Sequence, residues 1–497
     1  MTAPVLLDRQ KFLQRIAERR GPWDLAVVGG GATGVGIAVD AATRGYSVVL
    51  LEQHDFGKGT SSRSTKLVHG GVRYLQQGNI SLVMEALKER GMLLQNAPHI
   101  VHDQQFIVPN YEWWEAPFYG IGMKVYDMLA GKYGFGPSQI LSREEVLQRI
   151  PTLSQDGLRG GVKYHDGQFD DARLLIDLVT TAAEHGATLL NYTRVTGLSK
   201  DADGLINGLT CRDQESGTTY RVAARCVINA TGPFSDGLRQ LDDPTVKPMI
   251  SPSQGVHLVL PRHFLPGDTA IMVPHTRDGR VMFAVPWLGR VVVGTTDTAI
   301  PDAPLEPTPK TEEVDFILET ASGYLAQPPT RKDILSVFTG IRPLVKASDV
   351  DSTSALSRDH TIAISSSGML TIAGGKWTTY RHMAEDAVDH AIVLANLKER
   401  PCATRTLRIR KPEQDSPTAA WFARYEMART IEDVLARRTR LLFLDAQATL
   451  AVASDVAQEL AKELGRDDAW QLAQLADYAK VAQHFLPPEV TNVAILR

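Results

Sequence analysis

Hydrophobic positions in the first part of the chain fall into short continuous runs separated by a helical stretch. Residues 25–28 form an apolar run of the kind found in parallel strands that are buried on both faces. An alanine-rich helix is predicted at 37–43, and a second strand at 47–51. This order of a strand, a helix and a second strand is the unit from which doubly wound α/β sheets are built.

Glycines and one acidic residue punctuate this unit. Gly29, Gly31 and Gly34 follow the first strand with the spacing G-x-G-x-x-G, which allows a tight turn, close approach of a pyrophosphate and close packing of the helix. The helix N-terminus behind them favours phosphate groups. Glu52 ends the second strand, where a carboxylate can accept hydrogen bonds from a ribose diol. The unit is predicted to bind an adenine dinucleotide, and the motif alone does not choose between NAD and FAD.

The later elements fall into three groups. Helices at 80–96 and 172–185 and a buried strand at 222–232 continue the dinucleotide-binding sheet. Short strands joined by turns between 256 and 296 indicate an antiparallel sheet inserted into it. Beyond residue 401 the pattern is helical, with no strand signals. We therefore predict an α/β fold with an inserted antiparallel domain and a helical C-terminal domain.

An apolar stretch between 106 and 136 fits neither sheet. Aromatic, methionine and branched aliphatic residues crowd into it, interrupted by Pro117, Gly120 and Gly122. One interpretation is a buried helix of the inserted domain. The other is an interfacial surface that meets lipid or quinone.

Composition limits the classes of function. Of the 497 residues 43% are hydrophobic and 22% charged, as expected for a globular protein of two or three domains. The net charge of -4 and the lack of a Lys/Arg tract argue against nucleic acid as a partner. Three scattered cysteines predict neither a disulfide framework nor a metal site, and suit a reducing cytoplasm. No run predicts a signal peptide or a transmembrane helix, so any membrane contact is expected to be peripheral.

Three side chains are candidates for chemistry on an anionic substrate. Arg73 and Arg342 lie among apolar residues and glycines, where a guanidinium is costly unless an anion pairs with it. Because arginine binds phosphate oxygens in pairs, we predict that the two clamp a phosphorylated substrate, with structural ion pairs as the alternative. His257 interrupts an apolar strand and can accept a proton near neutral pH, although such a histidine is more often a packed core residue.

Four arginines gather in the helix predicted at 421–444. One interpretation is a solvated basic face, and the other is contact with anionic lipid headgroups. The four are Arg429, Arg437, Arg438 and Arg440.

Several blocks of sequence occur in the same order in one known family. From about Asp24 to Asp445, the chain resembles the FAD-dependent glycerol-3-phosphate dehydrogenases, within the wider group of D-amino-acid-oxidase-like enzymes. The blocks are 27–36, 61–75, 229–233, 294–297, 339–344, 374–381 and 426–440.

This resemblance implies an activity and partners. The cofactor is expected to be FAD, and the reaction the oxidation of sn-glycerol 3-phosphate to dihydroxyacetone phosphate with electrons passed to a membrane quinone. A cytoplasmic protein held peripherally on the inner face of the cell membrane is expected, with a homodimer as a further expectation. Three alternatives stay open: a glycerol-3-phosphate oxidase that uses oxygen, a flavin oxidoreductase acting on another hydroxy acid or amine, and a flavin-binding sensor without turnover.

The resemblance also implies roles for individual residues. Tyr74 joins Arg73 and Arg342 at the substrate, and His257 matches the active-site histidine, which makes it the expected proton acceptor. Arg342 is a rival for polarising the hydroxyl. Lys376 and Thr378 belong where flavin and substrate meet, and Lys376 is expected to stabilise negative charge on the reduced ring. The remaining implied cofactor contacts, besides the three glycines and Glu52, are Ser61, Ser62, Lys66, His69, Val195, Gly232, Gly375 and Thr379.

Pattern and resemblance together predict a discontinuous domain organisation. A Rossmann-type FAD-binding domain is followed and interrupted by an antiparallel-sheet substrate domain, and a helical domain ends the chain. The predicted ranges are 22–95, 160–250 and 345–397 for the FAD-binding domain, 96–159 and 251–344 for the substrate domain, and 398–497 for the helical domain.

Overall fold

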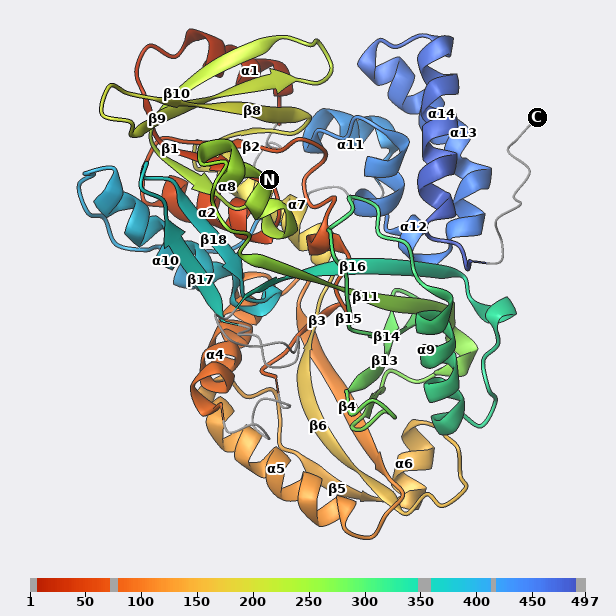
Figure 1. The fold of residues 1–497 in the computed structure, drawn as a ribbon. Helices are drawn as coiled ribbons and strands as arrows, with labels where there is room; N and C mark the ends of the chain where they lie inside the picture. Colours follow the sequence, from red (N-terminus) through yellow and green to blue (C-terminus); the bar gives the residue numbers. More distant parts are fainter. Residues whose placement is uncertain (1–6, 72–78, 347–358, 413–416, 489–497) are drawn as a thin grey trace.

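Two β-sheets and a group of C-terminal helices organise the chain (Figure 1). The structure is a computed structural model that describes residues 7–71, 79–346, 359–412 and 417–488. In Figure 1 the first sheet lies at the upper left, the second sheet below it, and the C-terminal helices beside the first sheet. This arrangement confirms the predicted α/β fold class.

The first sheet contains the dinucleotide-binding unit. The six strands along its main path are parallel except for one antiparallel edge strand, and two further strands of the sheet pair in antiparallel fashion. In sheet order they are β17 (His360–Ile364), β18 (Leu370–Gly374), β10 (Thr219–Asn229), β1 (Trp23–Val28), β2 (Val48–Leu51) and β7 (Thr188–Leu190). The helices that pack with this sheet are α1 (Arg9–Glu18), α2 (Ala32–Thr43), α7 (Asp171–Glu184), α8 (Ser235–Asp242) and α10 (Tyr380–Leu394).

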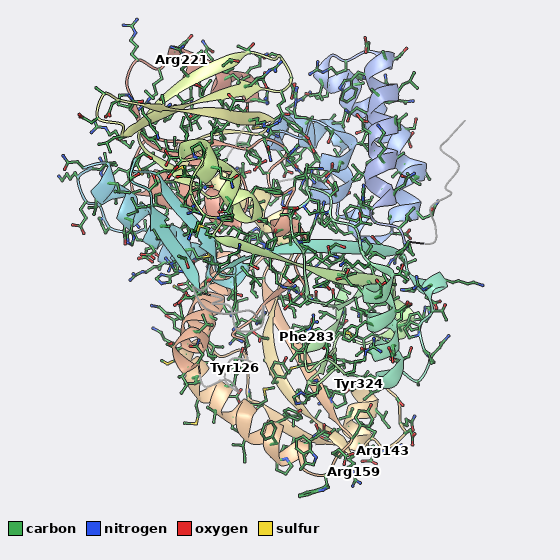
Figure 2. All side chains as sticks on the ribbon, in the orientation of Figure 1. Tyr126, Arg143, Arg159, Arg221, Phe283 and Tyr324 are labelled. Atoms are coloured by element: carbon green, nitrogen blue, oxygen red, sulfur yellow. The ribbon has the colours of Figure 1, made fainter. Side chains whose placement is uncertain are left out.

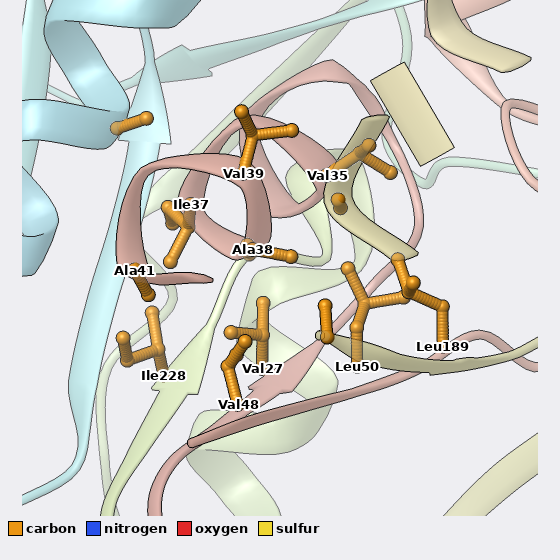
Figure 3. Packing of buried hydrophobic residues seen from close by; sticks show 14 of the residues in the cluster. Val27, Val35, Ile37, Ala38, Val39, Ala41, Val48, Leu50, Leu189 and Ile228 are labelled. Atoms are coloured by element: carbon orange, nitrogen blue, oxygen red, sulfur yellow. The ribbon is translucent and has the colours of Figure 1, made fainter. Parts of the chain in front are cut away.

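Apolar side chains of α2 cover the middle of this sheet. Figure 3 shows Val35 and Ile37 of the helix above Val27 and Leu50 of the two central strands, and all four side chains are fully buried. Burial on both faces explains why these strands have no alternating pattern. The helix begins at Ala32, five residues before its predicted start at 37, because the glycines of its first turns hide the helical period.

Two apolar stretches that read as single strands each contain two strands. Residues 187–195 contain β7 and the start of β8 (Thr193–Lys200), which are separated at Tyr192, whose φ of 50° lies in the left-handed region. Strand β8 pairs with β9 (Ile206–Asp213), which pairs with β10. Similarly, residues 362–373 belong to the β17–β18 hairpin, which turns at Gly368 with φ 85°. Both breaks depend on local backbone angles that the hydrophobic pattern does not encode.

The second sheet is mostly antiparallel, with one parallel pair between β12 and β4. It recruits β3 and β6 from stretches that the sequence assigned to the cofactor-binding domain. The strands are β15 (Thr298–Ala299), β11 (Ile250–Pro261), β14 (Arg290–Gly294), β13 (Met282–Trp287), β12 (Ala270–Val273), β4 (His102–Asn110), β6 (Gly160–Gln168) and β3 (Leu67–Val68), with β16 (Ser336–Val345) on β11 and β5 (Gln139–Ser142) on β6.

Helices flank the second sheet, and one of them resolves the apolar stretch at 106–136. Helix α5 (Glu115–Ala130) buries Tyr119, Met123 and Tyr126 but exposes Ile121 and Met128. The helix therefore has a buried face, as the first interpretation expects, and an exposed apolar face, for which contact with lipid or quinone stays a prediction. The other helices here are α4 (Ile80–Asn96), α6 (Arg143–Arg149) and α9 (Thr311–Tyr324). Within the described ranges, no helix has the length and apolar character that a membrane crossing requires.

The C-terminal region is helical, as predicted, but the helix expected at 421–444 is broken. Met427 and Arg440 adopt positive φ values of 56° and 62°, which end one helix and precede the next. The elements are α11 (Ala419–Glu426), a π-helical segment (Asp433–Arg438), α12 (Leu441–Leu444), α13 (Ala446–Leu464) and α14 (Asp468–Gln483). Their apolar side chains pack on Val259, Trp287 and Phe338 of the second sheet.

Both interpretations of the C-terminal arginines were wrong. Arg437 and Arg438 are buried and pair with Asp55, while the other two form ion pairs inside the fold, Arg429 with Glu215 and Arg440 with Asp170. The basic segment faces neither bulk solvent nor lipid, because carboxylates from the cofactor-binding part lie opposite it.

Candidate cofactor and substrate site

A cavity of about 880 Å³ opens at the carboxyl ends of β1 and β2. Ligands of open α/β sheets bind at this edge, and the volume lies within the range of about 300–1,000 Å³ typical of small-molecule sites. The predicted cofactor residues that line it are Gly29, Gly31, Glu52, Ser61, Val195, Gly232, Gly375 and Lys376. The structure therefore gathers residues from positions 29 to 376 of the chain around one cavity.

The glycine turn is shaped by close backbone contacts. Gly29 has a φ of 108°, and a Cβ there would lie 2.6 Å from the carbonyl oxygen of Ala230. A Cβ on Gly34 would lie 1.9 Å from the carbonyl oxygen of Gly29. Gly31 precedes the first residue of α2. The first and third glycines are thus required for packing, and the second places the start of the helix at the cavity.

Glu52 is held in place by two backbone amides. The N–H of Gly30 donates to one carboxylate oxygen at 2.6 Å, and the N–H of His54 donates to the other at 2.8 Å. Burial raises the pKa of Glu52, and these two donors partly offset the rise. The carboxylate is therefore oriented before any ligand arrives, at the place where a ribose diol is expected.

Ser61 joins the phosphate end of the cavity to the loop after β18. Its hydroxyl accepts the N–H of Ala32 at 2.9 Å, in the first turn of α2. Its carbonyl oxygen accepts the indole N–H of Trp377 at 2.8 Å. Trp377 follows Lys376, so this hydrogen bond brings the lysine loop next to the helix N-terminus.

The loop after β18 carries four of the predicted residues. Gly375 has a φ of 70°, and a Cβ there would lie 2.4 Å from the sulfur of Met383. The hydroxyl of Thr379 donates to the carbonyl oxygen of Lys376 at 3.2 Å. The hydroxyl of Thr378 accepts the backbone N–H of His69 at 3.2 Å. His69 leads to Arg73 and Tyr74, the predicted substrate residues that lie outside the described part of the chain.

Ser62 and Lys66 lie behind the cavity wall. Both side chains are buried, and the ammonium group of Lys66 donates to both carboxylate oxygens of Asp171 at 2.8 Å and to the carbonyl oxygen of Ser62 at 2.7 Å. Neither residue lines the cavity. A flavin contact for the two stays a prediction, and for Lys66 the ion pair already occupies the side chain.

His257 lies in β11 with its ring stacked on Phe338, at 4.7 Å between centroids. Its Nε2 lies 2.9 Å from the hydroxyl oxygen of Thr65, and its buried Nδ1 has no hydrogen-bond partner among the described residues. Burial lowers the pKa of His257 well below its usual value, and the charges of Arg342 and Lys66 lower it further. The ring is therefore neutral at pH 7.

Arg342 lies in β16, which pairs with β11, and its positive charge lowers the pKa of His257. The guanidinium donates to the carbonyl oxygen of Thr296 at 3.0 Å and lies 3.2 Å from a carboxylate oxygen of Asp297. A Cβ on Gly255 would lie 2.6 Å from it, so the glycine makes room for the guanidinium. The side chain keeps 26% of its surface exposed. The structure therefore shows the internal ion pair that was the alternative and leaves part of the guanidinium exposed, and the clamp stays a prediction.

Sequence reasoning missed three residues that hold the site together. Thr65 contacts His257, Asp171 pairs with Lys66, and Asp297 pairs with Arg342. Thr65 lies inside the block 61–75 that carries the family resemblance, but nothing in the local pattern shows which hydroxyl meets a residue almost 200 positions away. In the described ranges, no cluster of three or more His, Cys, Asp or Glu side chains could hold a metal ion.

Comparison with known families divides the chain into two matched regions. A family model described as FAD dependent oxidoreductase matches residues 24–381. A second, described as the C-terminal domain of alpha-glycerophosphate oxidase, matches residues 391–471.

Individual proteins that the chain resembles are named glycerol-3-phosphate dehydrogenases. The chain is 42% identical to the mitochondrial glycerol-3-phosphate dehydrogenase of Mus musculus over 91% of its own length and 61% of that protein's length. It is 37% identical to the Caenorhabditis elegans protein named "Probable glycerol-3-phosphate dehydrogenase, mitochondrial", covering 99% of this chain and 78% of that one. The structure is similar to that of glycerol-3-phosphate dehydrogenase from Bacillus halodurans with FAD, at a TM-score of 0.79, 27% identity and 98% and 99% coverage. The chain thus spans about three fifths of the length of the mammalian relatives.

Proposed function

The chain belongs to the FAD-dependent oxidoreductases, in the branch of the glycerol-3-phosphate dehydrogenases, and on this premise we propose that it oxidises sn-glycerol 3-phosphate to dihydroxyacetone phosphate. The observation that carries the proposal is that buried, neutral His257 and the guanidinium of Arg342 lie on the paired strands β11 and β16, close enough for the charge of Arg342 to lower the pKa of His257. The neutral ring of His257 can accept a proton, and the guanidinium of Arg342 can bind an anion. Oxidation of a phosphorylated alcohol needs both groups.

FAD is the cofactor of this family, and the described residues fit it. The turn at Gly29 and Gly34 admits no Cβ, which leaves bare backbone at the start of α2 for a pyrophosphate. Glu52 is oriented for a ribose, and Val195 and Gly232 line the same cavity. When bound, FAD supplies the two-electron oxidant that accepts the hydride from C2 of the substrate.

The substrate phosphate is assigned to Arg342. Asp297 and the backbone of Thr296 fix the orientation of the guanidinium, so little rotamer entropy is lost when an anion binds. The exposed part of the side chain allows a phosphate to approach. Arg73 and Tyr74 are proposed as its partners, because the His69–Thr378 hydrogen bond ties their stretch to the loop of Lys376.

The proton of the C2 hydroxyl is assigned to His257. If Nε2 carries the ring proton and donates it to the hydroxyl of Thr65, Nδ1 is left as the acceptor. Nδ1 is the ring atom without a hydrogen-bond partner in the part of the chain that the structure describes. Thr65 then positions His257 by fixing its tautomer, in the way that a hydrogen bond on one ring nitrogen generally sets the role of the other.

Anaerobic mixing with a panel of alcohols tests this function. Addition of glycerol 3-phosphate should bleach the flavin absorbance, and unphosphorylated glycerol should not. Bleaching by an amino acid or hydroxy acid instead would assign the chain to another oxidoreductase of this fold, and flavin that stays oxidised with every substrate would indicate a sensor.

The glycine turn gives a first prediction. Gly34→Ala should lower the affinity for FAD at least about tenfold, because its Cβ would overlap the carbonyl oxygen of Gly29 and push apart the turn that receives the pyrophosphate. FAD content after dilution and gel filtration measures the effect. Gly237→Ala is the matched control, since Gly237 also lines the cavity but a Cβ there has open space. Full FAD content in Gly34→Ala would remove the turn from the binding site.

The electron acceptor is proposed to be a quinone in the membrane, reached through an apolar face of α5 on the inner surface of the cell membrane. Trp114, Phe118, Ile121, Val125 and Met128 are spaced along one side of the helix, and all five are exposed. In Figure 2, Tyr126 lies on the opposite, inner side of the same helix, while Arg143 and Arg159 lie at the lower end of the second sheet. An exposed apolar stripe of this size is typical of a lipid or protein contact.

Changing this face should separate membrane binding from chemistry. In Ile121→Ser/Met128→Ser, co-sedimentation with phospholipid vesicles should fall about tenfold or more, since each buried apolar side chain contributes about 1.5–3 kcal/mol. Reduction of quinone in the vesicles should fall with it, while flavin bleaching by glycerol 3-phosphate should not change. Val393→Ser is the control, because Val393 is equally exposed on α10, outside this face. Hydrogen peroxide formed at the rate of turnover would favour oxygen as the acceptor, and sedimentation of the free protein would test the expected homodimer.

A further inference from the structure

We propose that Arg437 and Arg438, in the C-terminal helical region, position the loop that forms one wall of the FAD cavity and thereby set how tightly FAD is retained. The proposal rests on FAD as the cofactor and does not depend on which substrate is oxidised. It gives the C-terminal region a role in the cofactor site although none of its described residues lines the cavity.

The loop in question runs from Gln53 to Ser61, directly after β2. It contributes seven residues to the cavity wall, which are Gln53, His54, Gly57, Lys58, Gly59, Thr60 and Ser61. It also carries the N–H of His54 that orients Glu52 and the hydroxyl of Ser61 that meets α2. A shift of this loop would move the groups that face the ribose and the pyrophosphate together.

Asp55 lies at the centre of the loop and is fully buried. Both of its carboxylate oxygens receive guanidinium donors, since Arg437 donates through Nε to Oδ2 and Arg438 donates to Oδ1 at 3.0 Å and also to Oδ2. Burial alone would raise the pKa of Asp55, but the two arginines hold it below its usual value. An ionised carboxylate at this depth depends on those two partners.

Each arginine is in turn fixed within the C-terminal region. Arg438 donates to the carbonyl oxygen of Glu426 at 2.7 Å, and Arg437 donates to Glu432 at 2.7 Å and to Asp433 at 2.8 Å. Leu435 of the π-helical segment that carries both residues, and Ile431 just before that segment, pack on the second sheet. The arginines are therefore rigid contacts, held from behind by the helical region.

A second ion pair joins the same two parts. The ammonium group of Lys58, which lines the cavity, donates to Glu432 and lies 2.7 Å from a carboxylate oxygen of Glu306. Glu432 thus bonds both Lys58 of the loop and Arg437 of its own segment. Two contacts, at Asp55 and at Lys58, fix the position and the tilt of the loop relative to the C-terminal helices.

The rate of FAD release from the holoenzyme tests the proposal. After dilution, flavin fluorescence should rise about 10- to 100-fold faster in Arg438→Met and in Arg437→Met than in the wild type, the ordinary range of coupling between two sites. Arg424→Met is the matched control, because Arg424 belongs to the same region but forms an exposed pair with Glu463. In an Asp55→Asn background the Arg438→Met change should add little, since both substitutions remove the same contact.

Hydrogen exchange of the wild type provides a readout that a purely structural role would not move. Coupling is reciprocal, so the amides of residues 427–438 should exchange more slowly in the holoenzyme than after FAD has been removed. FAD release within about twofold of the wild type in both folded arginine variants would overturn the proposal. If those variants do not fold, equal exchange of 427–438 with and without FAD overturns it instead. A protein that retains FAD in this way but does not oxidise glycerol 3-phosphate would refute the proposed substrate alone.

Discussion

Arg342→Ala should raise the KM for glycerol 3-phosphate about 100-fold or more while FAD stays bound. Truncating one partner of a hydrogen-bonded charge pair costs about 2–5 kcal/mol, and each 1.4 kcal/mol is a factor of about ten in affinity. The guanidinium is oriented by Asp297 and Thr296, and the side chain keeps 26% of its surface exposed, so its loss removes an oriented donor set. Steady-state kinetics with an artificial dye as acceptor measures the KM.

The control must separate loss of the phosphate contact from loss of the fold. Arg277→Ala removes a guanidinium from the same domain, where it pairs with Glu319 at the surface, and should leave the KM unchanged. A second control is the FAD content, which should be the same in the wild type and in Arg342→Ala. An unchanged KM for glycerol 3-phosphate would show that Arg342 serves only its ion pair with Asp297.

How far the sequence predicts this fold depends on the range of the forces involved. The strand, turn and helix around Gly29 could be predicted because each step has a local cause: a buried apolar run, a spacing of glycines and a helix start. The ribose-binding role of Glu52 was predicted from the same short unit, because this acidic residue ends its second strand. Its two amide partners, at Gly30 and His54, lie within a few dozen residues of it.

Breaks inside an element were harder to predict. Tyr192, Gly368 and Met427 each interrupt a stretch that reads as one strand or one helix, through a positive φ that hydrophobicity does not encode. Glycine gives some warning of such a turn, but a tyrosine or a methionine gives none. The element boundaries were therefore less accurate than the element types.

Charged residues in a helix could not be assigned a partner from sequence at all. Arg437 and Arg438 read as a basic face open to solvent or lipid because their helix carries them in a row. The carboxylate that buries them, Asp55, is more than 380 positions away and sits in a loop whose pattern has no feature of its own. Only the packing of the helical region on the cofactor-binding part decides between a surface and a core.

His257 is an intermediate case, because the sequence singles out the residue as a candidate base but does not show its surroundings. An isolated histidine in an apolar strand predicts either a base or a core residue, and the structure makes it a buried ring that contacts Thr65 and lies under the charge of Arg342. Burial and a catalytic task are compatible here, because the same environment that hides the ring keeps it neutral.

His257→Gln should slow flavin bleaching in a single turnover by about a hundredfold or more, the usual contribution of a general base. Glutamine keeps a polar side chain of similar length and can still contact Thr65, but it cannot take up a proton. Anaerobic stopped-flow mixing at saturating glycerol 3-phosphate measures the rate, and FAD content should match that of the wild type. Equal bleaching rates in the two proteins would assign the proton to another group, with Arg342 as the rival.

The pH dependence of the same step carries a second signature of this base. Burial and the charges of Arg342 and Lys66 disfavour the imidazolium, so the pKa of His257 lies well below 6.5 and the neutral, accepting form persists as the pH falls. The wild-type rate should therefore be constant from about pH 8 to pH 6.5 and decline only below that, where the ring becomes protonated. In His257→Gln this decline should disappear, since no imidazole is left to titrate. A decline that begins above pH 7, or one that the variant retains, would mean that His257 is not the group whose protonation stops the reaction.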